Sequence, residues 1–193
     1  LNVRFTTDAN PWTFSVYLLC GLLPWNAFAE ALSRATTVMR ENTHLVKRIV
    51  YPLETLPLDL VLVAVLNQLI GFALLLPLAW AVTGRPPAAL WFVPVVLLLQ
   101  LLFSTGLSWI VASLAVYLPD MGQIVTLGLT VWMFLTPVFY PEDVVPEGLR
   151  WVLRLNPMAR IITLYRNAFM TGLLPSWRGL LGALGACLLV CLI

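Results

Sequence analysis

Charged side chains are scarce in this sequence. Only 10% of its 193 residues are Asp, Glu, Lys or Arg, whereas a soluble domain carries roughly 25%. Hydrophobic residues make up 61% and the mean hydropathy is +0.92, so too few polar side chains exist to cover a water-facing surface. A net charge of +2 gives no reason to expect a nucleic acid partner. These shortages exclude an ordinary soluble domain and predict an integral membrane protein.

Cysteine and histidine are also few. The three cysteines, Cys20, Cys187 and Cys191, lie scattered in apolar runs, which argues against a disulfide framework or a zinc site. They are interpreted as small packing residues. A single histidine, His44, cannot assemble a site made of several histidines. We therefore expect no metal and no cofactor bound by this chain itself.

The common catalytic motifs are missing. The sequence contains no GxxxxGK[ST] phosphate-binding loop, no HExxH and no GxSxG, each of which would mark a specific chemistry. The few carboxylates in apolar surroundings, Glu30, Glu54 and Asp59, lie near the ends of predicted helices rather than as a pair at the centre of the bilayer. The chain is therefore expected not to be an enzyme and to have no ATPase site of its own.

Five apolar stretches approach or exceed the roughly 20 residues that a membrane-spanning helix needs. They cover residues 12–37, 55–82, 88–118, 122–140 and 172–193. Strand-like alternation is absent and the stretches are rich in leucine, so a helical bundle is favoured over a barrel. The sequence predicts an all-α integral membrane protein, with residues 1–193 forming a single polytopic transmembrane domain of five spans.

The connection over residues 141–171 differs from the other, shorter connections. It contains two half-apolar pieces that are too short to span, separated by Asn156-Pro157. Such pieces fit a pair of re-entrant helices that enter the membrane and return to the same side. The alternative is one interfacial helix kinked at Pro157. The sequence favours re-entry.

The loop over residues 40–52 is short and basic. Asn42 or Thr43 can cap a short helix, in which Leu45 and Ile49 fall four residues apart on one face. Such an amphipathic helix suits docking into a groove on a soluble partner, but it equally suits contact with anionic lipid headgroups. Spacing alone leaves both readings open. The remaining residues of this predicted helix are His44, Val46, Lys47, Arg48 and Tyr51.

Polar stripes and aromatic residues occur inside the apolar stretches. Gln100, Ser104, Ser108 and Ala112 repeat every four residues, as do Gly122, Thr126 and Thr130, and close packing of helices explains such stripes better than a polar conduit does. Several aromatic residues lie far from the predicted span ends and could stack on sugar rings along a conduit, although ordinary lipid-facing packing is the better explanation for any one of them. They are Trp25, Phe28, Trp109, Trp132 and Phe134.

Three segments together resemble a known family. The first runs from Gly21-Leu22-Leu23-Pro24-Trp25-Asn26-Ala27-Phe28 through Asn42-Thr43-His44-Leu45-Val46-Lys47-Arg48 to Tyr51-Pro52-Leu53-Glu54. The second is Thr136-Pro137-Val138-Phe139-Tyr140. The third is Leu155-Asn156-Pro157, followed by Arg166. The chain resembles the transmembrane subunit of type-2 ABC exporters over essentially its whole length. Within that superfamily it is most similar to the branch that exports polysaccharides such as O-antigen, capsule or teichoic acid.

The resemblance implies a topology that arginine counts leave open. In this family six spans follow an amphipathic interface helix, so the five stretches correspond to spans two to six. Because the chain opens at Leu1 and stops inside an apolar run, we expect it to be a fragment of a longer permease. The loop of residues 42–51 becomes a cytosolic coupling helix and Pro119-Asp120-Met121 a second cytosolic contact. The external re-entrant hairpin contains Trp151, Asn156, Pro157 and Arg166.

The implied function is that of the membrane half of a two-subunit pump in the bacterial plasma membrane. Two copies of the chain would form a conduit, and separate cytosolic ATPase subunits, which bind the ATP and magnesium, would drive export of a lipid-linked glycan. One alternative is a type-2 ABC permease that exports a drug, an antibiotic or a lipid. A more remote one is a membrane-embedded polyprenyl-phosphate transferase, which would need an acidic metal-binding motif that the isolated Glu41 and Asp120 do not supply.

Overall fold

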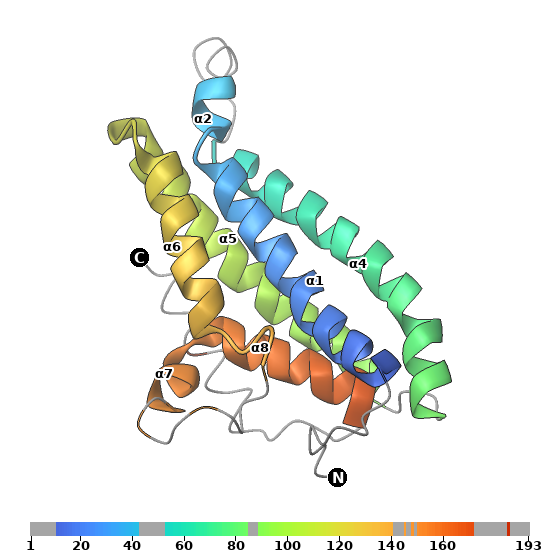
Figure 1. Ribbon diagram of the computed structural model, residues 1–193. Coiled ribbons are helices and arrows are strands. Elements are labelled where there is room, and N and C mark those ends of the chain that lie inside the picture. Colours follow the sequence, from blue (N-terminus) through green and yellow to red (C-terminus); the bar gives the residue numbers. More distant parts are fainter. Residues whose placement is uncertain are drawn as a thin grey trace.

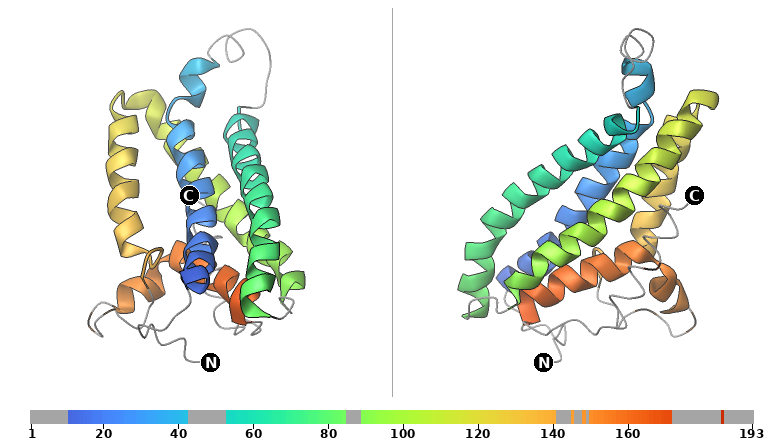
Figure 2. Two further views of the ribbon diagram at one scale, coloured as in Figure 1. Left: turned by 45° about the vertical axis from the view of Figure 1, so that its right-hand side comes forward. Right: turned by 180° about the vertical axis from the view of Figure 1, so that it is seen from behind.

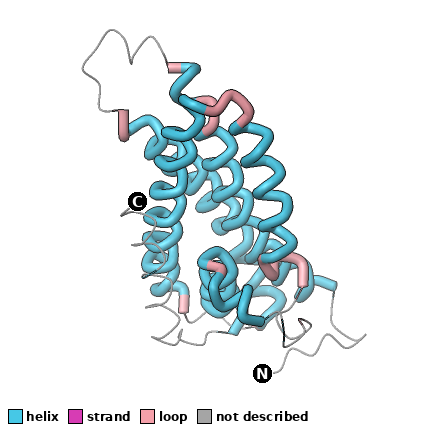
Figure 3. Tube along the Cα trace, turned by 90° about the vertical axis from the view of Figure 1, so that its left-hand side faces the viewer, coloured by secondary structure: helices cyan, strands magenta, loops and turns pink. Residues whose placement is uncertain are grey.

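The described part of the chain is helical throughout. The computed structural model describes residues 11–42, 53–84, 89–140, 145, 148, 150–171 and 185. Within these ranges no strand occurs and short turns connect the helices (Figure 3), which confirms the all-α class. In chain order the elements are α1 (Pro11–Ala35), α2 (Val38–Glu41), α4 (Thr55–Thr83), the 3-10 turn η1 (Leu90–Phe92), α5 (Val93–Tyr117), α6 (Met121–Leu135), α7 (Arg150–Leu155), α8 (Pro157–Arg166) and the π-helical turn η4 (Asn167–Thr171).

Three long helices form the body of the molecule. The stretches Trp12–Ala35, Thr55–Val82 and Leu90–Tyr117 are long and apolar enough to cross a membrane. They run side by side as α1, α4 and α5 (Figure 1). Large apolar side chains such as Leu66 and Leu74 remain exposed on α4, as expected for helices whose outer faces contact lipid. Three of the predicted spans are thus helices that are long and apolar enough to cross a membrane.

The fourth predicted span is shorter than the sequence suggested. Instead of covering residues 122–140, helix α6 ends at Leu135 after 15 residues. Thr136 is extended, with φ −106° and ψ 133°, because the residue before a proline avoids the helical region and Pro137 has no N–H to continue the ladder. The fifth stretch, residues 172–193, lies outside the described residues apart from Gly185.

The predicted break at Asn156-Pro157 separates two helices. Asn156 has extended backbone angles, φ −78° and ψ 111°, between α7 and α8, and Pro157 occupies the first helical position of α8, where its missing N–H costs nothing. Helix α4 ends at Gly84, whose φ of +65° forms a left-handed cap.

The bundle has two distinct ends. One end, here called the loop end, contains α2 and the turn between α5 and α6, and the other, here called the hairpin end, contains α7 and α8 (Figures 1 and 2). Helix α8 crosses beneath the long helices at the hairpin end and packs against α1 and α5. The largest buried side chains come from α1, α5, α8 and η4, and include Phe28, Phe103, Tyr165 and Phe169.

Candidate functional site

The loop end holds the residues predicted to face a soluble partner. Asn42 follows α2 and its Nδ2 donates to the Val38 carbonyl oxygen at 2.9 Å. The rest of the predicted coupling helix, residues 43–49 and 51, lies outside the described residues.

The predicted second contact lies at the same end as α2 (Figure 1). Pro119 and Asp120 are exposed and Met121 is buried. Arg40 of α2 reaches α5 close to this turn, where its Nη2 donates to the Ala115 carbonyl oxygen at 3.2 Å. The structure therefore brings the end of α2 and the 119–121 turn to one face of the molecule.

Three of the five predicted conduit aromatics meet inside the bundle. The Phe28 ring lies 5.7 Å from that of Trp25 and 5.3 Å from that of Trp132, measured between centroids. Phe103, which the sequence analysis did not single out, stacks on Phe28 at 5.6 Å. Trp25 and Phe28 are buried, at 3% and 0% exposure, so within one copy this cluster packs α1 against α5 and α6.

The other two predicted conduit aromatics lie apart from that cluster. Phe134 is 66% exposed on α6 and Trp109 is 38% exposed on α5. The Trp109 indole Nε1 donates to the Glu54 carbonyl oxygen at 2.8 Å, which ties α5 to the residue preceding α4.

A buried polar cluster joins four helices near the middle of the bundle. The amides of Gln68 on α4 and Gln100 on α5 exchange two hydrogen bonds, at 3.0 and 2.7 Å. Gln100 Nε2 also donates to the Pro24 carbonyl oxygen of α1 at 3.2 Å, and its Oε1 accepts from the Tyr165 hydroxyl of α8 at 2.9 Å. Tyr165 was not identified from the sequence, because only the tertiary fold brings it to Gln100.

The stripe that begins at Gln100 is a packing stripe within this chain. Gln100, Ser104, Ser108 and Ala112 are all buried, as the packing interpretation predicts. The second stripe differs, since Thr126 and Thr130 are exposed on α6 and donate to carbonyl oxygens one turn earlier in their own helix. Their face of α6 is therefore available to a neighbour outside the described chain.

Asn156 connects the hairpin end to α6. Its Oδ1 caps α8 by accepting from the backbone N–H groups of Met158 and Ala159, and it also accepts from the Trp132 indole at 3.0 Å. Its Nδ2 donates to Thr136 Oγ1 at 2.8 Å and to the Leu135 carbonyl oxygen at 3.4 Å. One buried amide thus fixes the start of α8 against the end of α6.

Arg166 connects the other end of α8 to the segment after α6. Its Nη1 and Nη2 donate to the carbonyl oxygens of Pro137 and Val138 at 2.6 and 2.7 Å. The guanidinium carbon lies 3.7 Å from the ring centroid of Tyr17 on α1, a cation–π contact. A Cβ at Gly21 would lie 2.8 Å from Nη2, so the absence of a side chain there makes room for the guanidinium.

The four predicted hairpin residues therefore have different surroundings. Asn156 and Arg166 are buried and hydrogen bonded, Pro157 begins α8, and Trp151 on α7 is 60% exposed. Arg166, which the sequence analysis named among the hairpin residues, is thus a buried cation with two backbone acceptors. No cluster of His, Cys, Asp or Glu suited to a metal ion occurs among the residues that the structure describes.

Comparisons with known proteins agree with this architecture. The chain matches the ABC-2 type transporter family over residues 2–170. It is 32% identical over 164 residues to the O-antigen export system permease protein RfbA of Myxococcus xanthus, covering 84% of this chain and 63% of that protein. It is 29% identical to RfbA of Klebsiella pneumoniae over 162 residues (83% and 62%), and 27% identical to the polysialic acid transport protein KpsM of Escherichia coli over 163 residues (83% and 62%).

The chain spans about three fifths of the length of these relatives. The family match covers most of the chain, including the three long apolar helices and the Asn156–Arg166 segment. This chain belongs to the ABC-2 type transporter family of membrane proteins.

Proposed function

We propose that this chain is the transmembrane permease subunit of an ABC exporter that moves a lipid-linked polysaccharide across the bacterial plasma membrane. A separate cytosolic ATPase subunit would supply the energy. The observation that carries the proposal is the similarity, over more than four fifths of the chain, to permeases named for O-antigen export and to a protein named for polysialic acid transport. The chain would bind neither ATP nor magnesium itself.

The proposed orientation puts the loop end in the cytosol. Two segments there, residues 42–51 and Pro119–Met121, would dock on the ATPase subunit. Their support is the position of α2 and of the α5–α6 turn at one end of the bundle and the Arg40–Ala115 hydrogen bond between α2 and α5. Closure of an ATPase dimer could then move α1, α4 and α5 through a small number of contacts.

The hairpin end would face outward in this proposal. Helices α7 and α8 would form a re-entrant pair, and the whole chain would provide spans two to six of a six-span subunit. A re-entrant helix needs its polar groups satisfied by the protein. The buried bonds made by Asn156 and Arg166 meet that need at both ends of α8.

Two copies of the chain would form the conduit between them. The exposed face of α6, with Thr126, Thr130 and Phe134, offers hydroxyl and aromatic groups of the kinds that bind sugars. Trp25, Phe28 and Trp132 would support that wall from behind, while Trp109 faces elsewhere on α5. The lipid part of the cargo would remain in the bilayer.

The proposal is tested by following the glycan. Full-length permease and its ATPase subunit are reconstituted in sealed vesicles with a radiolabelled lipid-linked glycan, and the fraction reached by an external glycosidase is measured. ATP-dependent exposure of the glycan is expected. ATP-dependent movement of a drug or a simple phospholipid, with none of the glycan, would contradict the polysaccharide assignment.

A further inference from the structure

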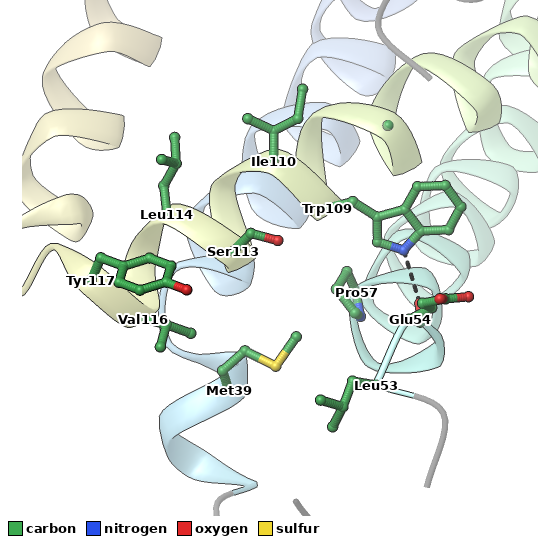
Figure 4. Close-up of a pocket in the computed structure, with 11 residues that line it drawn as sticks. Met39, Leu53, Glu54, Pro57, Trp109, Ile110, Ser113, Leu114, Val116 and Tyr117 are labelled. Carbon is green, nitrogen blue, oxygen red and sulfur yellow. Dashed lines mark hydrogen bonds between the residues drawn. The ribbon is translucent and has the colours of Figure 1, made fainter. Parts of the chain in front are cut away.

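A pocket that the proposed transport cycle does not use opens at the loop end. It has a volume of about 820 Å³ and lies between α2, the start of α4 and the C-terminal half of α5 (Figure 4). Pockets of roughly 300–1,000 Å³ are large enough to bury a small ligand. We call it the Trp109 pocket, and the lining residues used below are Met39, Pro57, Gly106, Trp109, Ser113 and Tyr117.

The lining of the Trp109 pocket is mainly apolar. Met39 is a flexible side chain that adapts to irregular apolar ligands, and Gly106 lines the pocket without a side chain to fill it. The polar edge of Trp109 is already used, because its Nε1 donates to the Glu54 carbonyl oxygen at 2.8 Å. The indole therefore contributes mostly apolar surface to the pocket.

The Trp109 pocket lies on the lateral surface of two spanning helices. Around it Trp109, Leu114 and Val116 are 38%, 43% and 58% exposed on α5, and α4 and α5 are both long enough to cross the bilayer. Exposed apolar surface of this kind marks contact with membrane or protein. Tyr117, the last residue of α5, is of a type that accumulates at the membrane–water interface, so the pocket extends from the apolar part of α5 to the depth where lipid chains meet headgroups.

We infer that the Trp109 pocket holds one acyl chain of a bilayer phospholipid from the adjacent leaflet. The apolar lining matches a hydrocarbon chain, and the lateral position lets a chain enter directly from the membrane. The inference does not depend on which cargo the exporter moves. The lipid in the pocket is a resident one and is not transported.

The charge at the pocket selects the headgroup. Glu54 is the one carboxylic acid in the described lining, and no ion pair to it occurs among the described residues. A carboxylate at headgroup depth attracts an ammonium group and repels an anionic lipid. The bound lipid is therefore a phosphatidylethanolamine rather than a phosphatidylglycerol.

The first test uses quenching of tryptophan fluorescence in the detergent-solubilised full-length protein. Phosphatidylethanolamine with a brominated acyl chain is added at about one lipid per chain. Quenching is expected in the wild type and mostly absent in Ser113→Phe, which fills the pocket with a ring. Leu98→Phe places the same ring at an exposed position of α5 outside the pocket, and should be quenched like the wild type.

Two further variants separate the parts of the inference. Trp109→Phe should remove most of the quenching, whereas Trp80→Phe, which deletes an exposed indole on the distant end of α4, should not. Glu54→Gln should weaken binding of brominated phosphatidylethanolamine by about two- to fivefold, the range expected for one exposed charge pair. Binding of brominated phosphatidylglycerol should not weaken in that variant.

Unaltered quenching in Ser113→Phe, with an unchanged melting temperature, would overturn the inference. Absence of quenching in the wild type at equimolar lipid would do the same. Loss of the ATPase subunit from Ser113→Phe, with quenching retained, would show that the pocket docks a protein instead.

Discussion

At the scale of single residues, Asn156 has more structural roles than any other predicted site residue that the structure describes. Its amide caps α8 and also bonds to the side chains of Trp132 and Thr136. An N-cap and a tertiary tie are separate functions, and different substitutions remove one or both of them.

Replacing Asn156 separates those functions. Asn156→Ser keeps a capping hydroxyl and loses the bonds to α6, whereas Asn156→Ala loses both sets, and loss of the cap alone costs about 0.5–2 kcal/mol. We expect the melting temperature of the detergent-solubilised protein to fall in the order wild type, Asn156→Ser, Asn156→Ala. Equal melting temperatures for the two variants would mean that the cap contributes nothing.

Gly21 offers a second test at this scale. A methyl group there would lie 2.8 Å from Arg166 Nη2 and 3.3 Å from the Val138 carbonyl oxygen. Gly21→Ala should therefore lower the melting temperature, although alanine is the better helix former. Gly128→Ala on α6 meets no atom within 4 Å, and as a control it should leave stability unchanged or raise it by about 0.5–1 kcal/mol.

A double-mutant cycle tests whether the destabilisation by Gly21→Ala comes from the clash with the Arg166 guanidinium. In an Arg166→Ala background the nearest atom that the Gly21→Ala methyl group would meet is gone and only the 3.3 Å approach to the Val138 carbonyl oxygen remains, so the second substitution should cost less than it does in the wild type. Fully additive losses would show that Gly21 is required for a different contact.

At the scale of elements, the Gln68–Gln100 pair determines how α1, α4, α5 and α8 meet. Gln100→Leu removes the pair and also leaves the Tyr165 hydroxyl without its acceptor, so the variant exposes several polar groups to an apolar interior. Interhelical hydrogen bonds in membranes contribute about 0.6 kcal/mol each on average.

The prediction for this pair is non-additivity. Gln68→Leu and Gln100→Leu should each destabilise the bundle, and the double variant should be less destabilised than the sum, because it leaves no orphaned amide. Denaturant unfolding followed by tryptophan fluorescence measures all three. Simple additivity would contradict direct contact between the two amides.

The elements were largely predictable from sequence because their causes are local. Long apolar runs mark the long helices, Gly84 ends α4, and Asn156-Pro157 separates α7 from α8. The early end of α6 was also encoded locally, in Thr136-Pro137, but the apolar run past it concealed the stop. The partners of Gln100, Arg166 and Trp132 were not predictable, since each pairing joins residues more than 20 positions apart. Which aromatic residues pack inside the bundle and which remain exposed depends on how each helix is rotated about its own axis, and the sequence alone does not specify that rotation.

At the scale of the whole molecule, the proposed function depends on the two ends of the bundle. The loop end would receive force from an ATPase, and the hairpin end is held by Asn156 and Arg166 to α6 and α1. A displacement at the loop end can reach the hairpin end through α1, α4 and α5, which run between the two ends, and through α6, which joins the 119–121 turn to Asn156. Docking at residues 42–51 is therefore the step on which the whole account depends.

The most direct measurement is co-purification of the full-length protein with the product of its adjacent open reading frame, followed by an ATPase assay of the complex. The account predicts a stable complex in the wild type, loss of transport-coupled ATPase activity in Leu45→Asp/Ile49→Asp, and near-normal activity in Ser33→Asp/Thr37→Asp. That control adds the same two charges, four residues apart, at exposed positions of the loop end. Full activity of the Leu45→Asp/Ile49→Asp complex, or failure of any ATPase subunit to bind the wild type, would contradict the account.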